Sequence, residues 1–222
     1  HYSMGGIPVN TDGQVRSSAE QLVEGFFAAG ECACVSVHGA NRLGSNSLLE
    51  CVVYGRRTGA AIAQYVQNRK LPEIQAQRYI SEAKQQIQAL LEQPGKYRIE
   101  QVRTAFQDAM TQHCGVFRTE SLMQEGIQQL QQLQQQSAQI YLDDTEIIEA
   151  LELGSLIVVG QLILQSALNR QESRGAHFRE DFPQRDDSNF LKHTLSYYSP
   201  AGIDLQYKPV SITMFEPQER KY

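Results

Sequence analysis

The feature that most constrains the fold is a long central tract, residues 67–174, in which apolar side chains recur at helical spacing. Residues three or four positions apart share one face of an α-helix, so this spacing predicts amphipathic helices. Pro72 suits the first turn of a helix that runs to about Gln93, where Pro94-Gly95 stops it. Two further helices are indicated by their inward-facing residues, which are Ile99, Val102, Phe106 and Met110 in one and Met123, Ile127, Leu130 and Leu133 in the other. The tract therefore predicts a helical bundle.

Two parts of this tract allow a second interpretation. The glutamines between residues 128 and 136 can indicate disorder, but the leucines among them keep helical spacing, which favours a solvated helix face. The last helix should start near Asp144 and is apolar on most sides. Because Glu152, Gln161 and Gln165 interrupt its apolar stretch, we expect the most buried helix of the bundle and no membrane span.

The chain before the tract, residues 1–66, mixes strand and helix signals. Asp12-Gly13 between short apolar segments indicates a hairpin, and the apolar run 22–29 has the length of a buried strand. A helix should begin near residues 45–47, because serine and asparagine cap free amides. Its single apolar face would consist of Leu48, Leu49, Val52 and Val53.

The chain after the tract, residues 175–222, changes character again. Alternating polar and apolar residues around 191–198 and 205–213, separated by a turn signal at 199–202, predict two short antiparallel strands. The predicted fold class is thus α+β, mainly α. A small mixed α/β segment comes first, then a helical bundle, then a short β-containing C-terminal region.

Composition excludes several classes of protein. A net charge of −5 opposes nucleic-acid binding, which usually requires a basic surface. The four cysteines lack a common zinc spacing, so we expect free thiols in a reducing compartment, with Cys32 and Cys34 acting as packing residues. Three histidines have no acidic partner at metal-ligand spacing, namely His113, His177 and His193, and no metal site is predicted. The chain begins at His1 without an initiator methionine, and we interpret it as part of a longer protein.

The loop of residues 38–48 carries the clearest chemical signal. Arg42 offers a planar guanidinium that suits a carboxylate, and the amides of residues 45–48 lie at a predicted helix N-terminus, which favours negative charge. The residues by themselves also allow a plainer interpretation, in which Ser45 to Ser47 only cap the helix and Arg42 pairs with a surface acid. Anion binding and helix capping both remain open at this point.

Three motifs, in order and spacing, resemble the flavoprotein subunits of succinate dehydrogenase and fumarate reductase. They are residues 1–7 (HYSMGGI), 25–31 (GFFAAGE) and 38–50 (HGANRLGSNSLLE). L-aspartate oxidase, a relative, shares parts of the third motif, but Leu43-Gly44 follows the respiratory form. Segments 114–119 (CGVFRT), 172–177 (ESRGAH) and 185–195 (RDDSNFLKHTL) also resemble the respiratory subunits, so the resemblance covers essentially the whole chain.

The resemblance implies a role for five residues. His1 and Arg42 match residues that bind the dicarboxylate substrate, and Glu31 matches an acid that contacts FAD near its ribityl or ribose portion. Ser47 and Leu48 match a pair whose backbone contacts the isoalloxazine ring. Reduction of the flavin places negative charge on its pyrimidine edge, which a helix N-terminus stabilises. His38 is expected to be structural.

The resemblance also implies what the chain does not contain. It has no Gly-x-Gly-x-x-Gly fingerprint for the FAD pyrophosphate, and the capping domain with the proton-transferring arginine is expected upstream, as is the histidine that links FAD covalently. No catalytic residue is therefore predicted within this chain. Domains are expected at 1–66 (the end of an FAD-binding domain), 67–174 (the helical bundle) and 175–222 (the C-terminal region).

The implied function is the interconversion of succinate and fumarate with FAD, with electrons passing to an iron–sulfur subunit of a membrane-associated complex. The implied location is cytoplasmic and peripheral, on the inner face of the cytoplasmic membrane, or on the matrix face if mitochondrial. An L-aspartate oxidase, or a non-catalytic helical interaction fragment, are the alternatives. The direction of the reaction does not follow from these residues.

Overall fold

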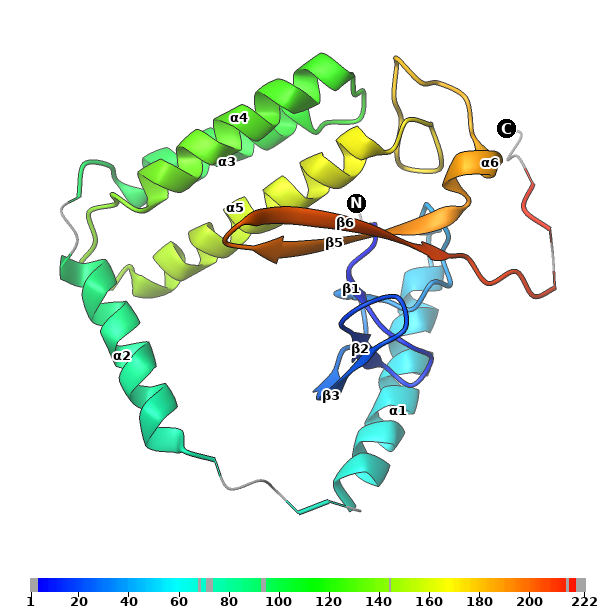
Figure 1. The fold of residues 1–222 in the computed structure, drawn as a ribbon, viewed down its shortest axis with the longest axis horizontal. Coiled ribbons are helices and arrows are strands. Elements are labelled where there is room, and N and C mark those ends of the chain that lie inside the picture. The colour runs from blue at the N-terminus through cyan, green and yellow to red at the C-terminus, as the bar shows by residue number, and fades with distance from the viewer. Residues whose placement is uncertain are drawn as a thin grey trace.

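The computed structural model describes residues 4–67, 69–70, 74–92, 95–143, 145–214 and 216–218. The helices are α1 Asn46–Gln67, α2 Ala76–Glu92, α3 Ile99–His113, α4 Glu120–Ser137, α5 Ile147–Asn169 and α6 Asp187–Phe190. The strands are β1 Ile7–Pro8, β2 Gln14–Arg16, β3 Leu22–Phe27, β4 Ala33–Cys34, β5 Lys192–Ser199 and β6 Gly202–Pro209. The predicted α+β, mainly α class is confirmed (Figure 1).

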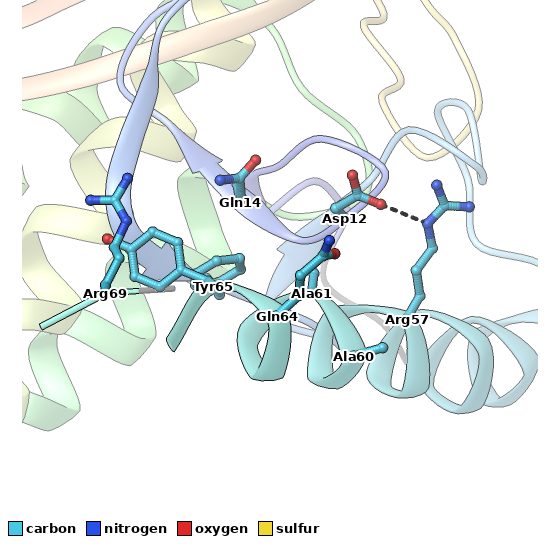
Figure 2. Close-up of a pocket in the computed structure, with 9 residues that line it drawn as sticks. Asp12, Gln14, Arg57, Ala60, Ala61, Gln64, Tyr65 and Arg69 are labelled. Carbon is cyan, nitrogen blue, oxygen red and sulfur yellow. Dashed lines mark hydrogen bonds and ion pairs between the residues drawn. The ribbon is translucent and has the colours of Figure 1, made fainter. Parts of the chain in front are cut away.

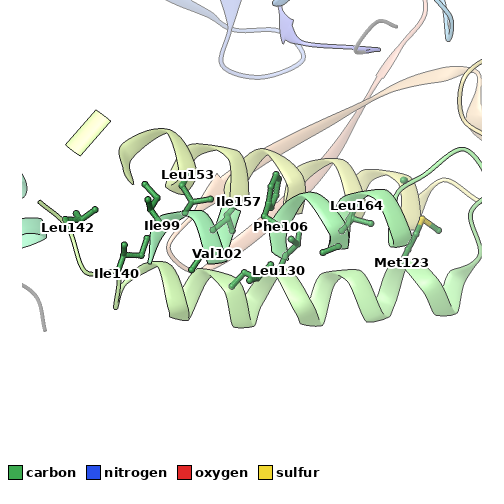
Figure 3. Close-up of a cluster of buried hydrophobic side chains, with 13 residues drawn as sticks. Ile99, Val102, Phe106, Met123, Leu130, Ile140, Leu142, Leu153, Ile157 and Leu164 are labelled. Atoms are coloured by element: carbon green, nitrogen blue, oxygen red, sulfur yellow. The ribbon is translucent and has the colours of Figure 1, made fainter. Parts of the chain in front are cut away.

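Helices α3, α4 and α5 pack together around the largest apolar core of the described residues (Figure 3). Val102, Met123 and Leu130 are buried completely or nearly so, as their helical spacing predicts. Each such side chain stabilises the fold by about 1.5–3 kcal/mol. Thr119 caps α4, since its side chain accepts a hydrogen bond from the backbone amide of Leu122.

Helix α5 buries one face and exposes the other. Leu153, Ile157 and Leu164 are fully buried in the core, whereas Ile148 is 69% and Val159 is 50% exposed. The helix expected to be the most buried of the bundle is therefore buried along one face only within this chain. Within the described residues, α5 is also the one helix long and apolar enough to cross a membrane, which is weak evidence because core helices share these properties.

Helix α2 leaves the bundle and leads back toward α1 (Figure 1). It begins at Ala76 and ends at Glu92, close to the predicted end at Gln93, and none of its residues is buried. Pro72, which suggested an earlier start, lies outside the described residues, as do Gln93 and Pro94.

The N-terminal region is built from short strand pairs. β1 pairs in parallel with β4, and β2 pairs with β3 in an antiparallel ladder. The predicted hairpin around Gly13 is confirmed, because Val9 and Val15 form an antiparallel bridge across it. The run 22–29 is wrong as a buried strand: among the described residues β3 pairs only with β2, and Phe26 is 51% exposed.

Helix α1 packs through its polar side rather than its apolar side. Leu48 and Val52 are 72% and 71% exposed, whereas Glu50 and Thr58 are buried. The backbone of Gly13 approaches α1 so closely that a Cβ there would lie 2.1 Å from Oγ1 of Thr58. The prediction that the apolar face packs inward is thus wrong within this chain, because the turn of residues 10–13 occupies the opposite face.

The two C-terminal strands form the predicted antiparallel hairpin, with Ser199 opposite Gly202 at its turn. The hairpin lies between the helical bundle and the N-terminal region (Figure 1). It is joined to the end of α5 by a hydrogen bond of 2.6 Å from Asn169 Nδ2 to the Tyr207 hydroxyl. The β5–β6 hairpin therefore brings the end of the chain close to the N-terminal loops.

Candidate functional site

The loop of residues 36–44 connects β4 to the N-terminus of α1. Ser36 and Ser45 have φ angles of 73° and 70°, in the left-handed region that L-residues with side chains rarely adopt. Ser45 accepts a hydrogen bond from the amide of Leu49, so α1 begins directly after this turn. Strained backbone of this kind persists where the surrounding contacts hold it, and it gathers at functional sites.

Arg42 is buried at the centre of this loop, with only 6% of the residue exposed. One terminal nitrogen donates to Glu50 Oε2 at 3.1 Å, and the other donates to the carbonyl oxygens of Glu31 at 2.9 Å and Ala33 at 3.3 Å. The guanidinium is therefore fixed in one orientation by α1 and by the β4 segment. Its Nε–H has no acceptor among the described residues, so the side chain keeps a donor for a ligand.

Glu50 is the residue that organises the cluster. Its Oε2 accepts hydrogen bonds from Arg42 and from His38 Nε2, the latter at 2.8 Å, while its Oε1 is buried without a partner among the described residues. A buried carboxylate held by a cation and a second donor is costly to disturb. His38, Arg42 and Glu50 thus form one buried polar cluster.

The sequence patterns singled out Arg42 but missed Glu50 and treated His38 as structural. One signal for Glu50 was available: it lies three residues after Ser47, on the same side of α1. That side is polar and buried, whereas the neighbouring apolar residues are exposed. The alternative in which Arg42 pairs with a surface acid does not hold, since Glu50 is 5% exposed.

The first turn of α1 lies beside this cluster. Ser47 is buried and its hydroxyl has no hydrogen-bond partner among the described residues, whereas Leu48 is largely exposed. The first amides of a helix lack internal partners and carry the positive end of the helix dipole. No acidic residue in this turn offsets that charge. The turn can therefore receive an anionic or electron-rich group.

The structure says less about two other predicted site residues, Glu31 and His1. Glu31 is exposed, and its backbone oxygen rather than its carboxylate contacts Arg42. His1 lies outside the described residues. The structure therefore brings Arg42 and Ser47 together at the start of α1, and it leaves the roles of His1 and Glu31 as predictions.

A second buried charged group supports the C-terminal region. Glu172 is fully buried and receives hydrogen bonds from Arg170, from Arg174 and from the amide of Asp186. Burial by itself would raise the pKa of Glu172, but these hydrogen bonds outweigh it and lower the pKa. Glu172 thus stays ionised and fixes the turn that follows it.

A pocket of about 510 Å³ lies farther along α1 (Figure 2). Its lining includes Asp12, Arg57, Tyr65 and Arg69, and Arg57 pairs with Asp12 at 3.0 Å. Both side chains of this ion pair are about half exposed, so solvent screens the interaction. The pocket contains none of the predicted site residues.

The described residues contain no group of three side chains of the types His, Cys, Asp and Glu that could hold a metal ion. The four cysteines are free thiols. Burial raises the pKa of the Cys34 and Cys114 thiols, so neither has the lowered pKa of a reactive cysteine.

Comparisons with known proteins show which family the sequence and the fold of this chain resemble. Residues 103–222 match the family model described as fumarate reductase flavoprotein C-term, and residues 1–48 match a model described as FAD binding domain. The chain is 37% identical over its full length to the fumarate reductase flavoprotein subunit of Haemophilus influenzae. It is 40% identical over 99% of its length to the succinate dehydrogenase flavoprotein subunit of Coxiella burnetii.

A solved structure of a variant of E. coli quinol fumarate reductase superposes on 99% of the chain with a TM-score of 0.90, at 36% identity. The chain spans 38% of that structure's chain, and 37% and 40% of the two curated relatives. The similarity therefore extends over this whole chain but over less than half of each relative.

Proposed function

Because the chain belongs to the succinate dehydrogenase and fumarate reductase flavoprotein family, we propose that it is the carboxylate-binding part of a flavoprotein subunit that interconverts succinate and fumarate. The observation that carries this proposal is the buried cluster of His38, Arg42 and Glu50 beside the first turn of α1. A fixed guanidinium next to a helix N-terminus suits a ligand with a carboxylate at one end.

The residues at the start of α1 fit FAD on the evidence of their own chemistry. The unpaired buried hydroxyl of Ser47 and the amides of the first turn offer donors, and Leu48 offers exposed apolar surface. Ser47 and Leu48 would hold the ring system, and Glu31 would contact the ribityl or ribose portion. FAD when bound supplies hydride transfer to and from the carbon skeleton of the dicarboxylate.

The residues of this chain would then orient the substrate. Arg42 and His1 each bind a carboxylate group, and Glu50 keeps the Arg42 guanidinium from turning away. Fixing both ends of a small dicarboxylate aligns its central carbons for reaction, which is worth several orders of magnitude in rate. No proton-transfer residue is assigned within the described part of the chain.

The partner is proposed to be an iron–sulfur subunit of a membrane-associated complex, with the protein peripheral on the cytoplasmic face of the membrane. The exposed apolar side chains on α1 and α5 support burial against other protein. Examples are Val52 at 71% and Ile148 at 69% exposed. Such surfaces usually mark interfaces rather than solvent-facing helices.

The direct experiment substitutes Arg42→Lys in the full-length flavoprotein assembled with its partner subunits. Lysine keeps the charge but loses the planar fork, so kcat/KM for both succinate oxidation and fumarate reduction should fall about 10- to 100-fold. Arg57→Lys is the matched control, because Arg57 is exposed on the same helix and pairs only with Asp12 among the described residues. It should leave the kinetics unchanged.

Activity of the unmodified protein on L-aspartate, but not on succinate or fumarate, would refute this proposal and favour the aspartate oxidase alternative. Wild-type kinetics in the Arg42→Lys variant would refute the role of Arg42. Iron–sulfur subunit binding with no dicarboxylate activity at all would favour the non-catalytic interaction fragment.

A further inference from the structure

The turn at Gly175 contacts the loop of residues 36–44 directly. The amide of Ala176 donates a hydrogen bond of 3.0 Å to the carbonyl oxygen of Ala40, two residues before Arg42. Gly175 has a φ of +59°, and a Cβ there would lie 2.4 Å from that same oxygen and 2.6 Å from the carbonyl carbon. Only glycine allows this approach, because the atoms that a methyl group would meet are backbone atoms.

A second contact reaches the same loop from the β5–β6 hairpin. His193 Nε2 lies 2.8 Å from the Ser36 hydroxyl, across 157 positions of sequence. Ser36 has its backbone in the left-handed region, which is unfavourable for a residue with a side chain. The hydrogen bond to His193 helps to hold Ser36 in that conformation.

Both contacts come from parts of the chain that are themselves rigid. Arg174 and His177 exchange backbone hydrogen bonds across Gly175, at 2.8 and 3.1 Å, which closes the turn. Glu172, fully buried, anchors Arg174 through two hydrogen bonds of 2.8 and 2.9 Å. His193 is within the regular ladder of β5 and β6. The turn at Gly175 and the β5–β6 hairpin therefore have little freedom to follow a displaced loop.

The two contacts flank His38 and precede Arg42 in the loop. Ser36 and Ala40 lie on either side of His38, and Ala40 lies just before Arg42, so a shift of either anchor moves both side chains that reach Glu50. We propose that Gly175 and His193 are positioning residues for the dicarboxylate site, holding the loop of residues 36–42 in the conformation that aims Arg42. This inference rests on the proposed function.

The primary test is Gly175→Ala in the full-length flavoprotein assembled with its partner subunits. The added methyl group pushes Ala40 away, so KM for the dicarboxylate and the dissociation constant of malonate, measured by flavin difference absorbance, should rise at least about 10-fold. The FAD content and the melting temperature should stay close to wild type, since the contact touches neither the flavin residues nor the helical core.

Gly202→Ala is the matched control. Gly202 also has a positive φ, +132°, but a Cβ there meets no atom within 4 Å. Alanine at position 202 is strained by the backbone at least as much as alanine at position 175, because a φ of +132° lies outside the left-handed helical region. It makes no contact with the loop, so the KM of Gly202→Ala should remain at the wild-type value. A KM increase in Gly202→Ala equal to that in Gly175→Ala would overturn the proposal.

A double-mutant cycle tests the second contact without relying on Gly175. Ser36→Ala and His193→Ala should each raise the malonate dissociation constant, and the double variant should be no weaker in binding than the worse single variant. Additive effects would overturn the role of His193. His193→Gln, which keeps a hydrogen-bonding group, should restore part of the affinity lost in His193→Ala.

The outcomes separate this inference from the function on which it rests. If Arg42→Lys impairs dicarboxylate kinetics while Gly175→Ala, folded and loaded with FAD, binds malonate as wild type does, the positioning role is refuted and the proposed function stands. If the unmodified protein neither binds malonate nor turns over succinate or fumarate, the proposed function itself fails.

Discussion

Gly126 in α4 faces α3 at a distance that leaves no room for a methyl group. A Cβ at position 126 would lie 2.6 Å from the Cβ of His113 and 3.2 Å from Cδ1 of Leu164. The closest atom is fixed to the α3 backbone, so no rotation of a side chain relieves the contact. Gly126→Ala must therefore move α3 and α4 apart within the buried core.

The size of the effect follows from two opposing terms. Overpacking a core by one methyl group costs about 1–3 kcal/mol, and replacing a helical glycine by alanine returns about 1 kcal/mol. For Gly126→Ala we expect a net loss of up to about 2 kcal/mol. Gly154 in α5 has no atom within 4 Å of its Cβ position, so Gly154→Ala should gain about 1 kcal/mol.

Urea unfolding followed by far-UV circular dichroism measures both variants against the unmodified protein. The slopes of the unfolding free energy against urea should agree, so that the midpoints report stability. The two variants should differ by about 1–3 kcal/mol, with Gly126→Ala the less stable. Equal stability, or a more stable Gly126→Ala, would refute the close approach of α3 and α4.

Two further outcomes are expected. Burial, with the nearby cation of Arg118 adding to it, lowers the pKa of His177 from 6.5 to about 4, and its Nε2–H donates to the carbonyl oxygen of Arg170. The unfolded chain therefore binds a proton at higher pH than the folded chain. The free energy of unfolding should be at its highest above pH 6.5 and should fall by up to about 3 kcal/mol as the pH drops toward 4. Urea titration at several pH values measures this, and the unfolding free energy of His177→Gln should depend less on pH. The 222-residue chain by itself should not retain FAD at unit stoichiometry, because it has no Gly-x-Gly-x-x-Gly phosphate-binding turn. Flavin absorbance of the purified chain measures this, and one FAD per chain would contradict it.

The helices of the bundle could be predicted because their signal is local. Thr119 caps α4, and Met123 and Leu130 recur at the spacing that places them on one buried face. The hairpin of β5 and β6 was predictable for the same reason, since alternation and a turn signal lie within a few residues of each other. Family membership was also predictable, because the motif around Arg42 is contiguous.

Burial of individual faces could not be predicted in the same way. Leu48 and Val52 form an apolar stripe on α1, yet the structure buries Glu50 and Thr58 on the opposite side. An apolar stripe predicts that a helix face is covered, but it does not identify the segment or partner that covers it. Within this chain, the turn at Gly13 packs against the polar face instead.

The sequence by itself determined the helical bundle, the C-terminal hairpin and the family, because each depends on residues close together in the chain. Only the tertiary structure decided that Glu50 joins Arg42 to His38, and that Gly175 and His193 contact their loop. The Ser36–His193 contact spans 157 positions. Spacing along a chain carries no information about such a pair, since the intervening helices set the distance between its ends.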